Sequence, residues 1–408
     1  MKIVQINGVD GILSTGVTTL QLSKYLTKNG IENMTVCRKD KGSQFSIPIG
    51  NKIDYRLHGL LSRLTGLQGC FSIISTIRLL YRLNKFSPDV IHLRNLHENF
   101  INIPLLLWYI GKKNIATVIT LHDCFFYTGG CTYYTDNHCD GWKTNKCRSC
   151  VYLGRTKKYW MGWSARFSYY YKYELFHKIK RLAVIGVSNW VAKEATEAPI
   201  FNKAKILKGI YNWIDLDLFT IQSLEEITSL KKQMGLNGKF IILAVASYWV
   251  PKKGLTDLLM LASKLPDEYR IIMVGKMPIE VDIPYNIISI PRTYDIRELV
   301  KYYNIADVFV HLSIEETFGK VTAESLSCGT PVVVYNSTAS PELVADGCGY
   351  IINNVGDYEA ILSSIYEIRR KGKGYYTNKC REKAELSFNS TTNCRQYIDV
   401  YKELLNSI

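Results

Sequence analysis

Short runs of Val, Ile and Leu recur along the chain, and segments with helical periodicity lie between them. Such near-continuous apolar runs are typical of parallel strands that are covered on both faces of a sheet. In the first half of the chain they predict strands at residues 2–6, 33–37, 89–93, 115–121 and 182–187. In the second half they predict strands at residues 239–247, 269–274, 286–290, 306–312, 330–335 and 349–352.

The alternation of strand and helix occurs twice, which predicts an α/β fold with two doubly wound, Rossmann-like domains. A chain of 408 residues agrees with this, because a single core stops growing near about 250–300 residues. The polar stretch at 215–239 is the best linker, so we expect domains over 1–214 and 215–387. A last helix over about 388–408 is expected to pack back on the first domain or to stay with the second. Ligands are expected in a cleft between the carboxyl ends of the two sets of strands.

The basic excess of the chain is confined to its first half. Residues 1–200 hold 27 Lys and Arg against 12 Asp and Glu, whereas residues 201–408 hold 24 of each. An acidic partner is therefore expected for the first half. No signal-peptide pattern and no apolar run long enough for a membrane span is found. These features predict a cytoplasmic protein.

Basic residues interleave with aromatic ones over 143–181, a stretch with one acid. The aromatic members are Tyr152, Tyr159, Trp160, Trp163, Phe167, Tyr169, Tyr170, Tyr171, Tyr173 and Phe176. This composition favours an anionic membrane surface. A solvated basic face with core aromatics is nearly as good an interpretation. Single-stranded nucleic acid is the weakest, because no RNA-binding or helix-turn-helix signature accompanies the stretch.

A glycine-rich turn, NGVDGILSTG, follows the first predicted strand at residues 7–16. Gly16 precedes a helix expected to begin at Val17, where backbone N–H groups could bind a phosphate. The spacing matches neither GxGxxG nor a P-loop, so an ordinary βα loop is an equal alternative.

Polar residues also follow the third and fourth predicted strands. His122 and Asp123 end the sequence TLHD, and Arg94 and His97 lie in HLRNLH. A histidine at such a strand end can bind a sugar hydroxyl or accept a proton. For an isolated His122, the better interpretation would be a structural histidine bonded to Asp123. The neighbouring Arg94 and His97 place more polar side chains at the same edge, which favours a binding site.

Four cysteines follow at once, at Cys131, Cys139, Cys147 and Cys150. Four thiols can close a tetrahedral structural zinc site. Only one CxxC pair is present, so free thiols are an equally strong alternative, and disulfides are the weakest in a reducing compartment.

The second half carries two motifs that suit a nucleotide sugar. Lys252 and Lys253 precede a helix and can neutralise a diphosphate. Glu316 lies in a loop after the strand ADVFVHL, and Glu324 lies on the following helix. Gly319, at the start of that helix, exposes backbone N–H groups to an anion. Carboxylates are suited to accept hydrogen bonds from sugar hydroxyls.

Taken together, these motifs resemble the retaining GT-B glycosyltransferases of family 4. The E-x7-E signature from Glu316 to Glu324 carries the resemblance, with TLHD at 120–123, VSNWVA at 187–192 and Lys253-Gly254 in the same order. The cysteine-rich stretch after TLHD looks like a branch that builds bacterial surface polysaccharides, including colanic-acid-type enzymes.

The resemblance implies a role for each matching residue. Glu316 and His122 would contact the donor sugar, Glu324 the ribose, and Gly16 the phosphate from the first domain. The remaining donor contacts would come from Lys252, Lys253, Phe318, Gly319, Lys320, Val321 and Thr322. Arg94, His97 and Asp123 would face the acceptor.

The resemblance also implies a reaction. A UDP- or GDP-sugar would donate its sugar to a lipid-linked saccharide with retention of configuration, without a catalytic cofactor. The enzyme would lie on the inner face of the cell membrane and would not bind nucleic acid. A GT-B epimerase, hydrolase or phosphorylase is the alternative.

Overall fold

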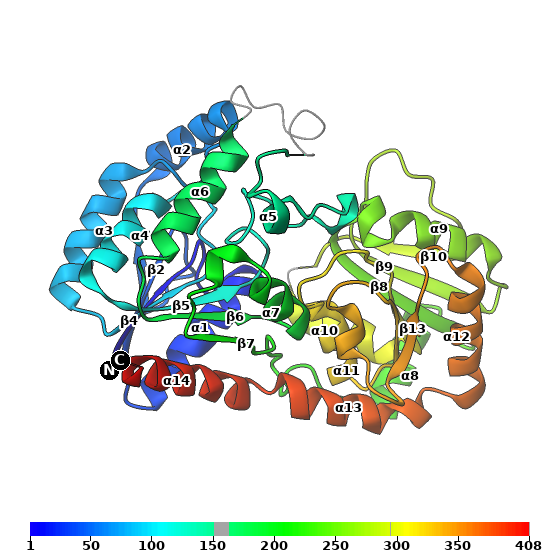
Figure 1. The fold of residues 1–408 in the computed structure, drawn as a ribbon. Helices are drawn as coiled ribbons and strands as arrows, with labels where there is room; N and C mark the ends of the chain where they lie inside the picture. Colours follow the sequence, from blue (N-terminus) through cyan, green and yellow to red (C-terminus); the bar gives the residue numbers. More distant parts are fainter. Residues whose placement is uncertain (151–162, 294, 408) are drawn as a thin grey trace. The chain divides into compact units, whose positions relative to one another are not determined.

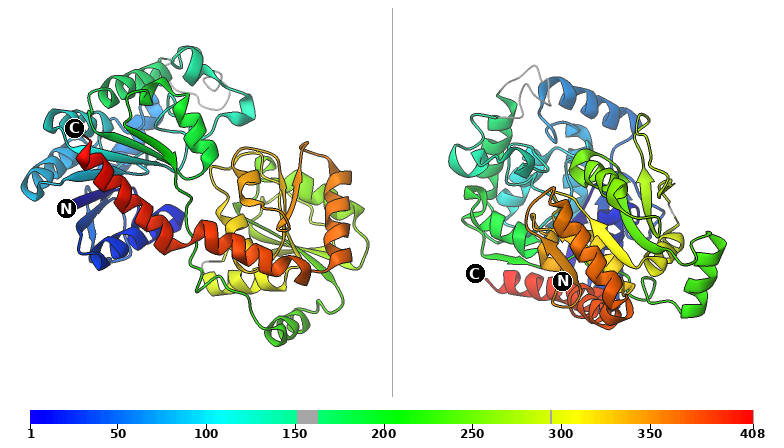
Figure 2. Two further views of the ribbon diagram at one scale, coloured as in Figure 1. Left: turned by 60° about the horizontal axis from the view of Figure 1, so that its bottom comes forward. Right: turned by 90° about the vertical axis from the view of Figure 1, so that its right-hand side faces the viewer.

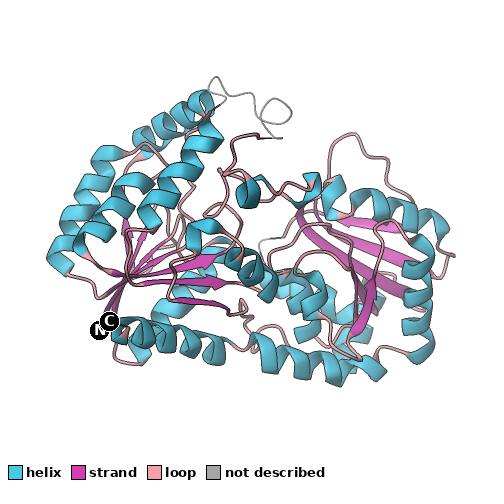
Figure 3. Cartoon of the chain, viewed as in Figure 1, coloured by secondary structure: helices cyan, strands magenta, loops and turns pink. Residues whose placement is uncertain are grey.

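The computed structural model describes residues 1–150, 163–293 and 295–407, and its described residues form two compact units. The first unit comprises Met1–Ile210 and Thr391–Ile408, and the second comprises Tyr211–Ser390. Each unit has one sheet with helices on both of its faces (Figures 1 and 3). The expected α/β fold with two parallel sheets is therefore confirmed.

The first unit has a seven-stranded parallel sheet in the order β3-β2-β1-β4-β5-β6-β7. Its strands are β1 (Lys2–Ile6), β2 (Glu32–Cys37), β3 (Ser46–Pro48), β4 (Val90–Leu93), β5 (Ala116–Leu121), β6 (Leu182–Gly186) and β7 (Ile206–Gly209). Its helices are α1 (Leu13–Lys28), α2 (Lys52–Thr65), α3 (Ile73–Phe86), α4 (Ile103–Lys113), α5 (Gly141–Thr144), α6 (Ser164–Phe176), α7 (Asn189–Thr196) and α14 (Ser390–Asn406), with 3-10 turns η1 (Thr135–Asn137) and η2 (Pro199–Phe201).

The second unit has a six-stranded parallel sheet in the order β10-β9-β8-β11-β12-β13. Its strands are β8 (Phe240–Tyr248), β9 (Tyr269–Lys276), β10 (Ile287–Ile290), β11 (Val308–His311), β12 (Val332–Tyr335) and β13 (Gly349–Ile352). Its helices are α8 (Leu224–Gln233), α9 (Leu255–Lys264), α10 (Ile296–Ile305), α11 (Lys320–Ser327), α12 (Tyr358–Lys371) and α13 (Gly374–Phe388), with 3-10 turns η3 (Pro251–Lys253) and η4 (Ser340–Leu343).

The strands found by apolar patterning match all of the second sheet and the inner strands of the first, whereas β3 and β7 of the first sheet were not predicted. Both are short edge strands, and their few apolar positions give too weak a signal. Helix α1 begins at Leu13, so the expected start at Val17 is wrong. Thr18 and Thr19 donate to the Thr15 carbonyl, which lies in the first turn of α1.

The last helix, α14, completes the first unit (Figure 2). Its Tyr401 hydroxyl meets His92 Nδ1 at 2.7 Å, and its Tyr397 hydroxyl meets Thr120 Oγ1 at 3.0 Å. His92 Nε2 meets Thr120 Oγ1 at 2.7 Å, which closes a buried polar network. Burial lowers the pKa of His92 well below its usual range, so the ring is neutral at neutral pH.

Within the described ranges, no helix has both the length and the apolar character that a bilayer span requires.

Replacing Tyr401 by Phe should destabilise the first unit. The change removes the hydroxyl that meets His92 Nδ1 and leaves a buried ring nitrogen without this partner. We expect the free energy of unfolding to fall by about 1–3 kcal/mol, measured by urea unfolding. Tyr170→Phe, whose ring is exposed on α6, is the matched control and should change it by less than about 0.5 kcal/mol. Equal losses in the two variants would contradict the network.

Candidate active site

A pocket of about 380 Å³ lies beyond the carboxyl ends of β8 and β11 in the second unit. Strand β8 leads into the 3-10 turn that carries two lysines, and β11 leads into the loop before α11. Five residues predicted from the sequence line the pocket, namely Lys252, Lys253, Glu316, Lys320 and Val321. Because parallel strands end at one edge, these distant parts of the sequence meet there.

Glu316 is the centre of the polar contacts in this pocket. Its Oε1 lies 2.5 Å from Lys253 Nζ and 3.2 Å from His311 Nε2. Burial raises the pKa of the Glu316 carboxyl, but Lys253 and His311 outweigh burial and the pKa falls to about 2. Glu316 is therefore a carboxylate at neutral pH and accepts hydrogen bonds.

Glu324 lies in the second turn of α11 and is buried. Its Oε2 accepts a hydrogen bond of 3.0 Å from Tyr303, and its Oε1 lies 3.7 Å from Lys320 Nζ. Burial raises the pKa of Glu324, although Lys320 opposes this effect. Glu324 is thus a second acceptor, held in one position by Tyr303.

The start of α11 offers backbone donors beside these carboxylates. Gly319 is the N-cap residue and has a φ of 87°, in the left-handed region that favours glycine. The first N–H groups of the helix have no intrahelical acceptor and attract anions. Thr322 is buried, and Phe318 packs its ring against Phe388 at 5.6 Å, so the Phe318 side chain belongs to the core.

His311 is a site residue that the sequence analysis missed. It ends β11, is buried, and bridges Glu316 and Thr322, whose Oγ1 lies 3.3 Å from His311 Nδ1. A polar residue at the last position of an otherwise apolar strand was the available signal.

In the first unit, His122 follows β5 and receives a hydrogen bond of 3.3 Å at Nε2 from Arg94 Nε. Burial and the Arg94 guanidinium lower the pKa of His122 well below its usual range. A neutral His122 that accepts at Nε2 carries its proton on Nδ1. This histidine is therefore a hydrogen-bond donor at neutral pH.

Arg94, which was expected to face the acceptor, lies in the core of the first unit. The side chain is wholly buried, and its Nη1 donates to Gln5 at 3.2 Å and to Thr19 at 3.0 Å. Arg94 therefore orients His122 from within the core, and a contact of Arg94 with the acceptor stays a prediction.

His97 and Asp123 form a pair, with His97 Nε2 at 2.7 Å from Asp123 Oδ2. Burial lowers the pKa of His97, but the Asp123 carboxylate outweighs burial and the pKa is raised. Asp123 therefore bonds to His97, whereas the structural interpretation of the sequence paired it with His122. Both side chains remain partly exposed at the same sheet edge as His122.

Gly16 lies inside the first turn of α1 and is buried. A Cβ there would approach the Gly11 nitrogen at 3.2 Å and Val9 Cγ2 at 3.1 Å. The position therefore favours glycine, because the preceding loop at Val9 and Gly11 packs closely on this turn. A phosphate contact at Gly16 stays a prediction.

The four predicted zinc ligands line one cavity of about 20 Å³ beside Trp142. None of these four described residues, Cys131, Cys139, Cys147 and Cys150, forms a disulfide in the structure. Burial raises the pKa of the Cys147 thiol to about 12. Among the described residues, no group of three or more potential ligands is arranged to hold a metal ion. A structural zinc ion therefore stays a prediction.

The basic and aromatic stretch divides between core and surface. Tyr169, Tyr171 and Phe176 are buried, whereas Trp163, Phe167 and Tyr170 are exposed. Lys172 is fully buried, donates to the Phe125 and Thr128 carbonyls at 2.5 and 2.6 Å, and has its pKa lowered to about 8 by burial. Tyr152, Tyr159 and Trp160 lie outside the described residues.

Two family models match the chain, one over each half. The model described as Glycosyltransferase Family 4 matches residues 15–218, half of the chain, and the model described as Glycosyl transferases group 1 matches residues 226–385.

D-inositol 3-phosphate glycosyltransferase from Mycobacterium sp. (strain KMS) is 28% identical over 171 residues, which are 38% of this chain and only 38% of that protein. An uncharacterized 41.2 kDa protein in the cps region of Klebsiella pneumoniae is 26% identical over 396 residues, 95% of this chain and 96% of the relative. The crystal structure of Anabaena HepE in complex with UDP-glucose superposes with a TM-score of 0.65 at 16% identity, covering 99% of this chain and 100% of that chain. This likeness shows a shared GT-B fold.

Replacing Lys253 by Met should destabilise the second unit in a pH-dependent way. The pKa of Glu316 is about 2, below the ordinary 4.5, so its ionisation stabilises the fold above pH 4.5 and ceases to do so as the pH falls towards 2. At pH 7 we expect a loss of about 3 kcal/mol in the free energy of unfolding. The difference from the parent chain should shrink as the pH falls below 4.5.

Lys264→Met, on the exposed last turn of α9, is the control and should cost less than about 0.5 kcal/mol. A pH-independent loss for Lys253→Met, measured by urea unfolding across this pH range, would show that the ion pair is not its cause.

Proposed function

Because the chain belongs to glycosyltransferase family 4, we propose that it transfers a sugar from a nucleotide-sugar donor to a saccharide acceptor with retention of configuration. The observation that carries the proposal is the set of groups at the start of α11. An ionised Glu316, the lysines of η3 and the helix N-terminus occupy one pocket of the second unit. Carboxylates suit sugar hydroxyls, and the cations and the helix suit a diphosphate.

The donor would be bound through three kinds of contact. Glu316 accepts hydrogen bonds from hydroxyls of the donor sugar, and Glu324 accepts from the ribose. Lys253 has three N–H donors, of which two are directed to Glu316 and the Glu315 carbonyl, so one remains for phosphate. The neighbouring Lys252 and the first N–H groups of α11 would also bind the donor phosphates. A UDP- or GDP-sugar fits these contacts.

Catalysis would rest on stabilising charge as the sugar–phosphate bond breaks. Lys252, Lys253 and the α11 N-terminus stabilise the leaving diphosphate, so no catalytic cofactor is proposed. The neutral His122 donates to a donor-sugar hydroxyl near the reacting carbon. The acceptor attacks from the face that the diphosphate leaves, and the diphosphate takes the acceptor proton.

The acceptor proposed is a lipid-linked saccharide at the cytoplasmic face of the membrane, in surface-polysaccharide synthesis. The similarity to the cps-region protein along nearly the whole chain supports this setting. The His97–Asp123 pair, at the same sheet edge as His122, is the proposed contact with the acceptor saccharide.

Transfer from a panel of UDP- and GDP-sugars, using a lipid extract as acceptor, would test the proposal. Glu316→Gln removes the charge that faces the donor sugar and should lower the transfer rate at least about 100-fold. Its affinity for the nucleotide diphosphate should change less than about tenfold, because other groups hold the phosphates. Product analysis by mass spectrometry, and of the anomeric configuration by NMR, measures the outcome.

Glu359→Gln, on the exposed first turn of α12, is the control and should keep the parent rate. Unchanged turnover of Glu316→Gln would contradict the site. An altered nucleotide sugar or a free sugar, produced equally without acceptor, would indicate an epimerase or a hydrolase instead.

A further inference from the structure

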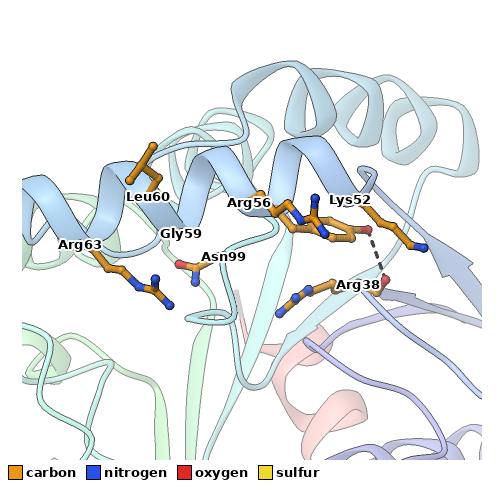
Figure 4. A pocket seen from close by; sticks show the side chains of 8 residues that line it. Arg38, Lys52, Arg56, Gly59, Leu60, Arg63 and Asn99 are labelled. Carbon is orange, nitrogen blue, oxygen red and sulfur yellow. Dashed lines mark hydrogen bonds between the residues drawn. The ribbon is translucent and has the colours of Figure 1, made fainter.

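A cationic pocket of about 610 Å³ lies against α2 in the first unit (Figure 4). Its charged lining consists of Arg38, which follows β2, and of Lys52, Arg56 and Arg63 on α2. In Figure 4 Arg63 and Lys52 extend from the side of α2 on which Arg38 and Asn99 lie, and Leu60 projects from the other side. Four positive charges therefore converge on a space large enough for a phosphate group and part of a saccharide.

An acid near the charges of this pocket is Glu98, whose carboxyl pKa is raised by burial and lowered in part by Arg38, but Glu98 and Arg38 form no ion pair. Within the described part of the chain, no carboxylate lies within 4.0 Å of any of the four cations. Arg38 is held by neutral groups, because its guanidinium lies 4.9 Å from the centre of the Tyr55 ring and donates to the Glu98 carbonyl at 3.1 Å. The helix acid, Asp54, accepts a hydrogen bond of 2.9 Å from Ser75 on α3. An anion is thus the natural ligand of the pocket.

An apolar row runs along α2 beside the cations. Ile53, Leu57, Leu60 and Leu64 are 77%, 53%, 53% and 43% exposed, at spacings of four, three and four residues. These spacings place them on one face of a helix with 3.6 residues per turn. The buried His58 and Ser62 occupy the opposite side, which faces the unit. The outer surface of α2 therefore combines a basic stripe with an apolar stripe.

The next helix extends the apolar exposure. Ile73, Ile74 and Ile77 of α3 are each more than half exposed. Helices α2 and α3 are linked by the contact of His58 Nδ1 with Ser72 Oγ at 2.8 Å, just before α3. Exposed Leu and Ile on two linked helices, with cations beside them, are typical of a surface that lies on an anionic bilayer.

The position of the pocket connects it with the acceptor residues. Arg38 and Asn99 follow β2 and β4, and the His97–Asp123 pair follows β4 and β5. All of these strands are parallel, so the pocket and the pair lie at the same edge of one sheet. A phosphate in the pocket would direct its attached saccharide along this edge.

We propose that α2 docks on an anionic membrane and that its cationic pocket binds the phosphate or diphosphate of the lipid-linked acceptor. Ile53, Leu57, Leu60 and Leu64 enter the bilayer interface, and Arg38, Lys52, Arg56 and Arg63 hold the phosphate. The inference rests on the proposed function for the identity of the acceptor. It moves the membrane contact from the stretch at 143–181, where the sequence suggested it, to α2.

Flotation of the full chain with phosphatidylcholine vesicles tests the docking. One set contains phosphatidic acid, a phosphate monoester, and the other contains phosphatidylglycerol at equal surface charge. The parent chain should bind both sets and prefer phosphatidic acid. Lys52→Glu/Arg56→Glu should lose that preference and weaken binding at least about tenfold, because two pocket cations become acids.

Lys24→Glu/Lys28→Glu, on exposed positions of α1 in the same unit, makes the same change of charge at the same spacing and should keep the preference. Ile53→Ser/Leu57→Ser/Leu64→Ser should lose binding to both vesicle sets. Circular dichroism establishes that each variant is folded, and a variant that is not is replaced by Arg56→Gln or Leu57→Ser alone.

If the α1 and α2 charge variants weakened vesicle binding equally, the pocket would have no specific role. Binding would then rest on the general attraction between a basic protein and anionic lipid. Competition by millimolar glycerol phosphate, without any vesicle binding, would assign the pocket to a free phosphate and overturn the docking. Binding to a single-stranded RNA in place of vesicles would also overturn it. Vesicle binding is measured without a donor, so its failure beside intact nucleotide-sugar turnover rejects this inference and leaves the proposed function standing.

Discussion

The parallel direction of every paired strand is the constraint on which the rest of the structure depends. Each sheet ends all of its strands at one edge, so residues far apart in the sequence meet there. Polar side chains are costly in the layers between sheet and helices, but they are solvated or paired at this edge. The Glu316 cluster, the His97–Asp123 pair and the α2 pocket all occupy such an edge. Topology thus determines where the chemistry lies, and local sequence determines what it is.

Within this frame, the sequence predicted what depends on local pattern. Buried central strands and the residues that follow them, such as Lys253 and Glu316, were found because a long apolar run marks each strand. The burial of Arg94 and the role of His311 were not found, because both depend on neighbours contributed by other segments. The apolar row of α2 was missed for a different reason. Its spacing is that of any amphipathic helix, and only the structure shows which side is covered.

The Glu316 cluster of the second unit and the α2 pocket of the first unit use charge in opposite ways. In the second unit, acids and bases neutralise each other at short range, and Lys253 keeps Glu316 ionised despite its burial. In the first unit, several cations are used in different ways. Lys172 donates hydrogen bonds to carbonyl groups inside the core. Among the described residues, no acid forms an ion pair with the cations of the α2 pocket. The net charge of a chain therefore says little about function until it is known which charged side chains lie in the core and which lie at the surface.

Helix α14 has a consequence for the order in which the chain can fold during synthesis. The first unit needs helix α14 to satisfy His92 and Thr120, yet this helix is made after the whole second unit. The second unit is continuous in sequence and leaves the ribosome complete before this helix. In the usual vectorial order the N-terminal domain folds first. Here the first unit can finish folding only after the second unit has been made. Until α14 has been made, a nascent chain would expose the part of the first unit's core that this helix covers. Chaperones could bind the exposed apolar surface at that stage.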